Sequence, residues 1–255
     1  TIKSWGAYVA ATISFLASSL MLKNYLGGVG NNNILVAPDP LNFPLYISLV
    51  VVSFYLAIIS AVTISKERDQ GTLEVLFYGP VNNTTYILSK YLADMTIFLF
   101  LIGLLIPYFI LVSILTNLAL SWGLAKGIIL SIFSASCIIS FSLLVSTATS
   151  KMRNSVIWIV ALLGAFLSIQ LGNGILLRLN ESALTPLVKY LKITINVVNT
   201  GIEWVTPFAP LNKGVQAIVT SNEQFYLGSI LFALLYSSFF LLASIAVLSK
   251  KGVQA

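Results

Sequence analysis

The sequence has 255 residues, of which 58% are hydrophobic and 9% are charged, and its formal net charge is +6. Soluble domains carry about 25% charged residues, so this composition excludes a water-covered globular domain and is typical of an integral membrane protein. The basic excess does not indicate a nucleic-acid partner, because membrane proteins use Lys and Arg to set their orientation in the bilayer. The apolar runs lack two-residue alternation, so membrane-spanning helices are predicted rather than a β-barrel.

Long apolar runs predict an all-α integral membrane protein with six transmembrane helices in one domain, residues 1–255. The predicted spans are residues 5–22, 44–64, 91–116, 124–149, 155–171 and 225–248. Residues 24–43 are rich in Gly, Asn and Pro and predict a loop. The fourth span is rich in serine, which favours close helix packing, with a polar translocation wall as the alternative.

A charged segment, residues 65–92, separates the second and third predicted spans. Within it, Leu73, Leu76 and Phe77 follow helical spacing, which predicts a short amphipathic helix that ends at Gly79-Pro80. Asn82 or Asn83 can then cap the next helix. The apolar face of the short helix is suited to a groove on a soluble partner, and a helix lying on the lipid surface is the alternative.

Residues 172–224 form the longest segment that is not predicted to span the membrane. Its apolar stretches, among them residues 187–191 and 193–198, are interrupted and too short to cross a bilayer. They predict re-entrant or interfacial helices between the fifth and sixth spans.

The distribution of Lys and Arg predicts that both termini are cytoplasmic, because every short loop on that side is basic. The charged segment is then cytoplasmic and the long segment between the last two spans is external. Asn180, in the sequence Asn180-Glu181-Ser182, becomes an exposed candidate for glycosylation.

Several chemistries have no motif in this sequence. There is no phosphate-binding loop, no nucleophile elbow and no metal-binding motif, and histidine is absent, so no catalytic or metal-ligating residue is predicted. The spans are predicted to lack buried charge, since Asp94 and Lys126 lie near span ends. Ion-coupled carriers hold ionisable groups at mid-membrane, so the energy for any transport is expected from outside the chain.

The charged segment resembles the cytoplasmic loop of permease subunits of the type-2 ATP-binding-cassette (ABC) exporters. The resemblance rests on the run Glu67-Arg68-x-x-Gly71-Thr72-Leu73-Glu74-x-Leu76-x-x-x-Pro80-Val81, followed by Ile87 and Lys90. Elsewhere it is a likeness of layout: the number of spans, the cytoplasmic ends and the helices before the last span. In this family a longer amphipathic helix usually precedes the first span, whereas here four residues precede Trp5.

The resemblance implies a plasma-membrane exporter subunit whose coupling helix docks on a separate ABC-type ATPase subunit. ATP and Mg²⁺ would bind in that partner, so this chain is not expected to be an enzyme by itself or to hold a cofactor. A second permease, identical or homologous, would complete the translocation path within the lipid bilayer. The residues expected at the ATPase contact are Glu67, Arg68, Gly71, Thr72, Leu73, Glu74, Leu76, Phe77 and Pro80.

Each group of these residues has an expected role. Leu73, Leu76 and Phe77 would form the docking face, and the charged residues Glu67, Arg68 and Glu74 would make polar contacts at its rim. Gly71 would permit a tight turn, and Pro80 would end the helix.

Two other classes remain open from the sequence. One is a structural or accessory subunit of a larger membrane complex, which binds a partner other than an ATPase. The other is an intramembrane enzyme such as a lipid transferase, for which only Asp94 and the acids of the charged segment are available. The sequence does not predict a substrate.

Overall fold

The computed structural model describes residues 5–32, 39–79, 82–177 and 186–251, and these form helices joined by short turns. The helices are α1 (Trp5–Asn32), α2 (Asn42–Asp69), α3 (Thr72–Phe77), α4 (Asn83–Thr116), α5 (Trp122–Ala148), α6 (Met152–Leu177), α7 (Pro186–Val205), α8 (Ala209–Val219) and α9 (Glu223–Lys251). The described part of the chain contains no strand, so the all-α prediction is confirmed.

Five of these helices, α1, α2, α4, α5 and α9, are long and apolar enough to cross a membrane. Helices suit this environment because each satisfies its backbone hydrogen bonds internally, where lipid offers no partner. The predicted fifth span, residues 155–171, lies in α6, whose apolar stretch among the described residues is the shorter Met152–Phe166. A sixth crossing by α6 therefore stays a prediction.

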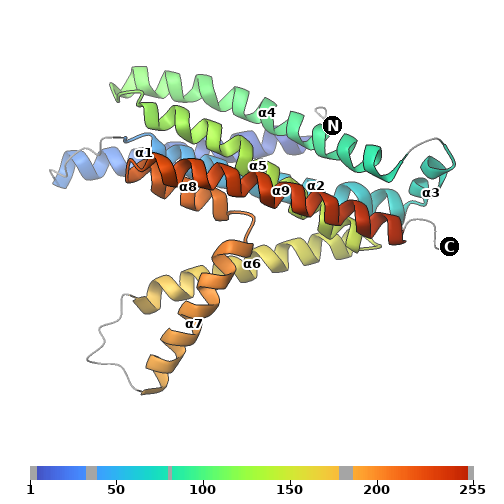
Figure 1. Cartoon of the computed structure of the whole chain (residues 1–255). Coiled ribbons are helices and arrows are strands. Elements are labelled where there is room, and N and C mark those ends of the chain that lie inside the picture. Colours follow the sequence, from blue (N-terminus) through green and yellow to red (C-terminus); the bar gives the residue numbers. More distant parts are fainter. Residues whose placement is uncertain (1–4, 33–38, 80–81, 178–185, 252–255) are drawn as a thin grey trace.

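Helix α5 is central to the bundle (Figure 1). It packs most extensively against α9 and α2, while α4 lies against α5 and α2, and α1 lies against α2. Helix α8 packs against both α5 and α9. Helix α6 packs against α2 and α5 and also contacts α7, and α7 diverges from the remaining bundle, as Figure 1 shows.

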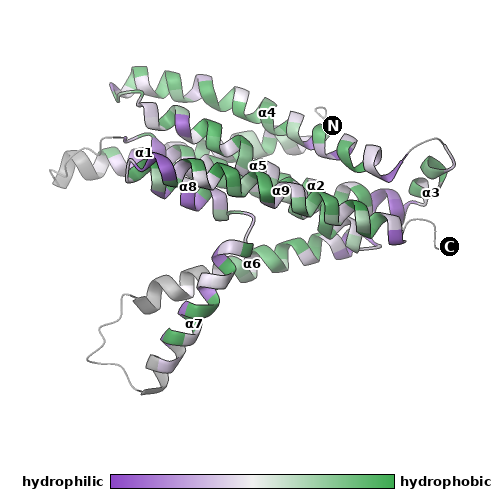
Figure 2. Ribbon diagram, viewed as in Figure 1, coloured by the Kyte–Doolittle hydropathy of each residue, from purple (hydrophilic) through white to green (hydrophobic). Residues whose placement is uncertain are grey.

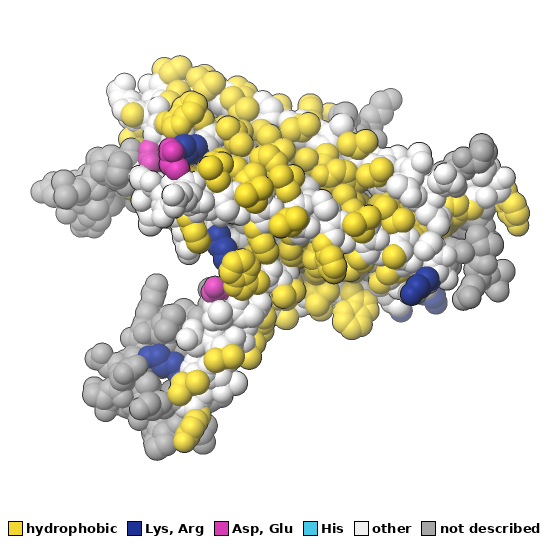
Figure 3. Space-filling model, in the orientation of Figure 1, with side chains coloured by type: hydrophobic (Ala, Val, Ile, Leu, Met, Phe, Trp, Pro, Cys, Tyr) yellow, Lys and Arg dark blue, Asp and Glu magenta, His cyan; other side chains and the backbone are white. Residues whose placement is uncertain are grey.

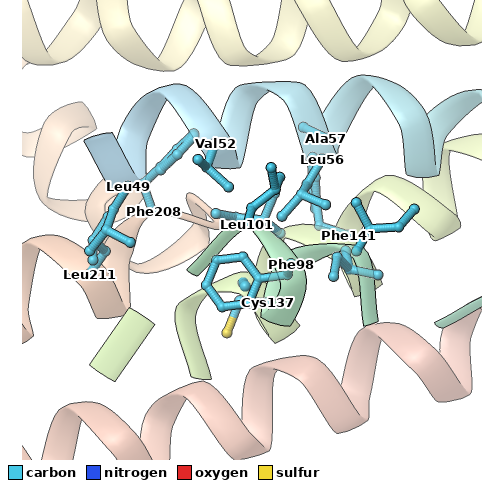
Figure 4. Close-up of a cluster of buried hydrophobic side chains, with 14 of the residues drawn as sticks. Leu49, Val52, Leu56, Ala57, Phe98, Leu101, Cys137, Phe141, Phe208 and Leu211 are labelled. Atoms are coloured by element: carbon cyan, nitrogen blue, oxygen red, sulfur yellow. The ribbon is translucent and has the colours of Figure 1, made fainter. Parts of the chain in front are cut away.

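The buried core joins α2, α4, α5 and the start of α8 (Figure 4). Leu56 of α2, Phe98 of α4 and Cys137 of α5 are almost completely buried there. All six α5 serines are also buried, and they allow its neighbours to approach closely. Close helix packing, rather than a polar wall, therefore accounts for them within this chain.

The outer faces of the bundle are apolar. Figure 2 shows hydrophobic residues along the lengths of α4 and α9. On α9 the side chains of Leu227, Leu231, Leu235, Phe239 and Leu242 are 59–72% exposed and follow one another at helical spacing. An exposed stripe of this kind is suited to lipid or to another apolar helix.

The prediction of a loop over residues 24–43 is wrong for residues 24–32, which are helical. Helix α1 continues to Asn32, and α2 begins at Asn42, with residues 33–38 between them outside the described chain. Glycine costs only about 1 kcal/mol in a helix, and a helix that has already formed gains one hydrogen bond per added residue. The turn chemistry of this segment therefore did not stop the helix.

The segment between the last two predicted spans contains two helices, α7 and α8, as expected. Residues 187–191 and 193–198, treated as separate pieces from the sequence, belong to the single helix α7. Their depth in a membrane stays a prediction. Asn180, the candidate glycosylation site, lies outside the described residues.

Candidate partner-docking site

The predicted short helix of the charged segment is present as α3, which projects beyond the end of the bundle (Figure 1). Helix α2 ends at Asp69, and the N–H of Gly71 donates to the carbonyl of Arg68 at 3.1 Å. Gly71 has φ +68°, in the left-handed region that favours glycine, and this conformation turns the chain sharply into α3. The hydroxyl of Thr72 donates to the carbonyl of Glu67 at 3.1 Å, which fastens the first turn of α3 to α2.

The apolar face predicted for docking lies largely against the protein itself. Leu73 is 5% exposed and belongs to the core, and the half-buried Phe77 ring lies 5.7 Å from the ring of Tyr86. Leu73 is therefore not available to a partner in this conformation. The apolar side chains that α3 and its following turn expose are Val75 at 69%, Leu76 at 39% and Tyr78 at 89%.

Glu67 connects α2 to α4 rather than standing at a free rim. Its carboxylate accepts a hydrogen bond from the Tyr86 hydroxyl at 2.5 Å and forms an ion pair with Lys90. The side chains of Glu67 and Lys90 are 23% and 24% exposed, so the pair is partly shielded from water. Both acceptor atoms of Glu67 are thus engaged within the chain.

Arg68 connects α2 to the end of α5. Its Nη1 donates to the carbonyl of Thr147 at 3.0 Å and to that of Thr149 at 3.2 Å. The last carbonyls of a helix have no partner within the helix, so a guanidinium is well suited to them. Arg68 therefore makes contacts within the protein, and its expected contact with a partner stays a prediction.

The structure gives less information about two other residues of the predicted docking set, Glu74 and Pro80. The backbone of Glu74 belongs to α3, while its side chain lies outside the described part of the structure. Pro80 lies outside the described residues altogether. The start of the next helix agrees with the sequence, because α4 begins at Asn83 after the N-cap Asn82.

Asp94 corrects the expectation that the spans lack buried charge. It is 3% exposed, and its Oδ2 has no hydrogen-bond partner among the described residues. The signal was available in the sequence, since Asp94 falls midway between the apolar residues Ile87 and Leu101 at seven-residue spacing, which places all three on one face of α4. All three are buried.

Lys126, by contrast, lies near the start of α5 as expected and pairs with Glu223 at 3.1 Å. No group of three or more His, Cys, Asp or Glu residues that could hold a metal ion occurs within the described ranges.

Comparison with known proteins gives one family. The family model described as ABC-2 family transporter protein matches residues 6–250, nearly the whole chain. No curated protein matches at a significant level. The match agrees with the multi-pass helical architecture and with the resemblance seen in the charged segment. The chain therefore belongs to the ABC-2 family of transporters and is a membrane permease of that family.

Proposed function

We propose that this protein is the membrane-spanning subunit of an ATP-driven exporter and that α3 is its coupling helix. Movement of a bound ATPase subunit would reach the spans through α3. The observation that carries the proposal is that α3 exposes apolar side chains to solvent and is also anchored in the core of the protein. Val75, Leu76 and Tyr78 are open to a partner, while Leu73 is buried in the core.

The base of α3 is connected to three long helices. Thr72 bonds to α2, Glu67 links α2 to α4, and Arg68 links α2 to the end of α5. A push on α3 would thus act on α2, α4 and α5 together instead of bending a loose loop. This arrangement supports a role in transmitting movement, which a helix resting on lipid would not need.

ATP hydrolysis would take place in the partner, where ATP and Mg²⁺ bind. A second permease, identical or homologous, would face this one across the translocation path, with lipid on the outside. Both termini and α3 would lie on the cytoplasmic side of the plasma membrane. Helix α9 ends at the same end of the bundle as α3, which is consistent with this orientation (Figure 1).

The partner is tested by a pull-down from mild detergent through a tag at Ala255, followed by mass spectrometry. Recovery of a stoichiometric subunit with a phosphate-binding loop is expected. Recovery of other membrane subunits without an ATPase would instead favour an accessory role in a larger complex.

The docking surface is tested by Leu76→Asp, with Leu120→Asp as the matched control. Leu76 is 39% exposed on α3, and Leu120 is 51% exposed in the turn at the opposite end of the bundle. We expect Leu76→Asp to reduce co-purification of the ATPase at least tenfold while the permease keeps its thermal unfolding midpoint. Leu120→Asp should leave co-purification unchanged. Equal retention of the ATPase by both variants would contradict docking through α3.

A further inference from the structure

A cavity of about 600 Å³ with charged residues in its wall lies between α2, α7, α8 and the start of α9. Figure 3 shows a hollow between α7 and the rest of the protein, with basic and acidic side chains at its wall. The cavity is lined by Asn199, Glu203 and Thr206 on and just after α7, and by Lys213 on α8. The wall also contains apolar residues such as Val215 and Phe225, so it suits an occupant that carries both charged groups and some apolar surface.

Two polar atoms of residues in this wall are buried without a hydrogen-bond partner among the described residues. Asn199 is 4% exposed, and its Oδ1 accepts no hydrogen bond from any described residue. Thr206 is 1% exposed, and its hydroxyl is likewise unpartnered within the described chain. An unsatisfied buried polar group is unfavourable, so two of them beside one cavity favour a ligand that supplies the missing hydrogen bonds.

The two charges at the cavity are opposite in sign, and they belong to different helices. Glu203 accepts a hydrogen bond from Nδ2 of Asn199, which holds its carboxylate on α7. The Nζ of Lys213 lies 3.0 Å from the ring centroid of Trp204. The ion pairs within the described residues are formed elsewhere, so Glu203 and Lys213 do not neutralise each other directly.

The electrostatic surroundings of Lys213 agree with this geometry. Burial lowers the pKa of Lys213, and the nearby carboxylate of Glu203 opposes that effect. An anionic group of a ligand close to Lys213 would further favour its ammonium form. An ammonium group close to Glu203 would likewise find the free oxygen of Asn199 as a second acceptor.

From this arrangement we propose that the cavity binds a zwitterion with a primary ammonium group and a phosphate. The ammonium donates to Glu203 and to Oδ1 of Asn199, and the phosphate accepts from Lys213 and from the hydroxyl of Thr206. A lone cation or a lone anion would satisfy only one of the two charges. The same chemistry is found in the headgroup of an ethanolamine phospholipid and in free phosphoethanolamine. The site does not depend on α3 or on an ATPase.

Isothermal titration of the full chain in detergent with O-phosphoethanolamine tests the site for a free solute. Saturable binding is expected, and ethanolamine and methyl phosphate, which each carry one of the two charges, should bind at least tenfold more weakly. Glu203→Gln should weaken phosphoethanolamine binding at least tenfold and leave methyl phosphate binding unchanged. Its matched control is Glu223→Gln, because Glu223 lies on the same side of the protein but outside this cavity.

Lys213→Met should give the opposite selectivity, with ethanolamine binding retained and methyl phosphate binding lost. Lys126→Met is the control, since Lys126 pairs with Glu223 away from the cavity. The conservative Glu203→Gln change keeps an oxygen for Asn199, so this variant is expected to fold. Equal loss of binding in Glu203→Gln and Glu223→Gln would overturn the proposal.

The lipid source is tested by native mass spectrometry of the protein released from nanodiscs that contain equal amounts of phosphatidylethanolamine and phosphatidylcholine. Choline has no N–H to donate, so preferential retention of phosphatidylethanolamine is expected, and Glu203→Gln should abolish the preference. This result without binding of free phosphoethanolamine assigns the site to a lipid headgroup. Binding of the free solute without lipid preference assigns it to a soluble zwitterion. Absence of both effects would overturn the proposal.

Discussion

Arg68 donates from Nη1 to the carbonyl of Thr147 at 3.0 Å, and this bond joins the last turn of α2 to the last turn of α5. The same nitrogen also reaches the carbonyl of Thr149 just beyond α5. Helix α5 is the central helix of the bundle, so this contact links the candidate docking site directly to the core.

Arg68→Met is therefore expected to lower the stability of the protein as well as its response to a partner. Hydrogen bonds that involve a charged group contribute about 1.5–3 kcal/mol, so the variant should lose roughly 2 kcal/mol in free energy of unfolding. The loss is measured as a lower midpoint of thermal unfolding in detergent. Arg153→Met, at the exposed Arg153 in the first turn of α6, is the control and should not shift the midpoint. Equal shifts of the unfolding midpoint in the two variants would show that Arg68 contributes no more to stability than an exposed arginine.

The Glu67–Lys90 pair should contribute more than an ordinary surface ion pair. Both side chains are about three-quarters buried, and Glu67 has Tyr86 as a further partner. A double-mutant cycle with Glu67→Gln and Lys90→Met should give a coupling free energy of about 1 kcal/mol.

The Lys126–Glu223 pair supplies the comparison, because the Glu223 side chain is 80% exposed. The same cycle there, with Glu223→Gln and Lys126→Met, should give less than about 0.5 kcal/mol. A larger coupling at the exposed pair would show that partial burial does not strengthen the link between α2 and α4.

Much of the fold could be predicted from the sequence, because apolar length and turn chemistry determine helices locally. The predicted spans fall within helices apart from Thr149, one residue beyond α5, and α3 and the start of α4 lie where Gly71 and Asn82 place them. The end of α1 could not be predicted in this way. Its Gly- and Asn-rich residues are typical of a loop, yet they extend a helix that had already formed.

The location of the candidate docking site could be predicted from the sequence, but the contacts that its residues make could not. Helical spacing groups Leu73, Leu76 and Phe77, but it does not show which side of that group meets the rest of the chain. That side depends on where α4 passes α3, a tertiary relationship that brings Tyr86 against Phe77. The partners of Arg68 are likewise about 80 residues away in sequence. No local pattern contains that information.

Asp94→Asn is expected to stabilise the protein. The carboxylate is 3% exposed, and its Oδ2 lacks a partner among the described residues, so a neutral side chain of the same shape removes a poorly solvated group. The gain should be about 1 kcal/mol in free energy of unfolding, measured by thermal unfolding in detergent. Asp69→Asn, at the exposed Asp69 of α2, should cause no change. A loss of stability in Asp94→Asn would show that the attraction between Asp94 and the nearby ammonium of Lys90 outweighs the cost of burying the carboxylate.

Gly214→Ala tests the close approach of α8 to α5. A Cβ atom at Gly214 would lie 2.3 Å from Cδ2 of Leu130 and 2.9 Å from its Cγ, and Leu130 is completely buried. The whole leucine side chain would have to shift within a packed core, which costs roughly 1–3 kcal/mol. The variant should therefore show a lower thermal unfolding midpoint than the wild-type protein.

The control for this prediction is Gly228→Ala on α9, where a Cβ atom meets nothing within 4 Å. Alanine is the better helix former, so this variant should unfold at the same temperature or higher. Combining Gly214→Ala with Leu130→Ala should cost less than the sum of the two single changes, because the smaller side chain at residue 130 makes room for the added methyl group. Strict additivity would mean that the two residues do not meet, and α8 would then have to pack on α5 by another face.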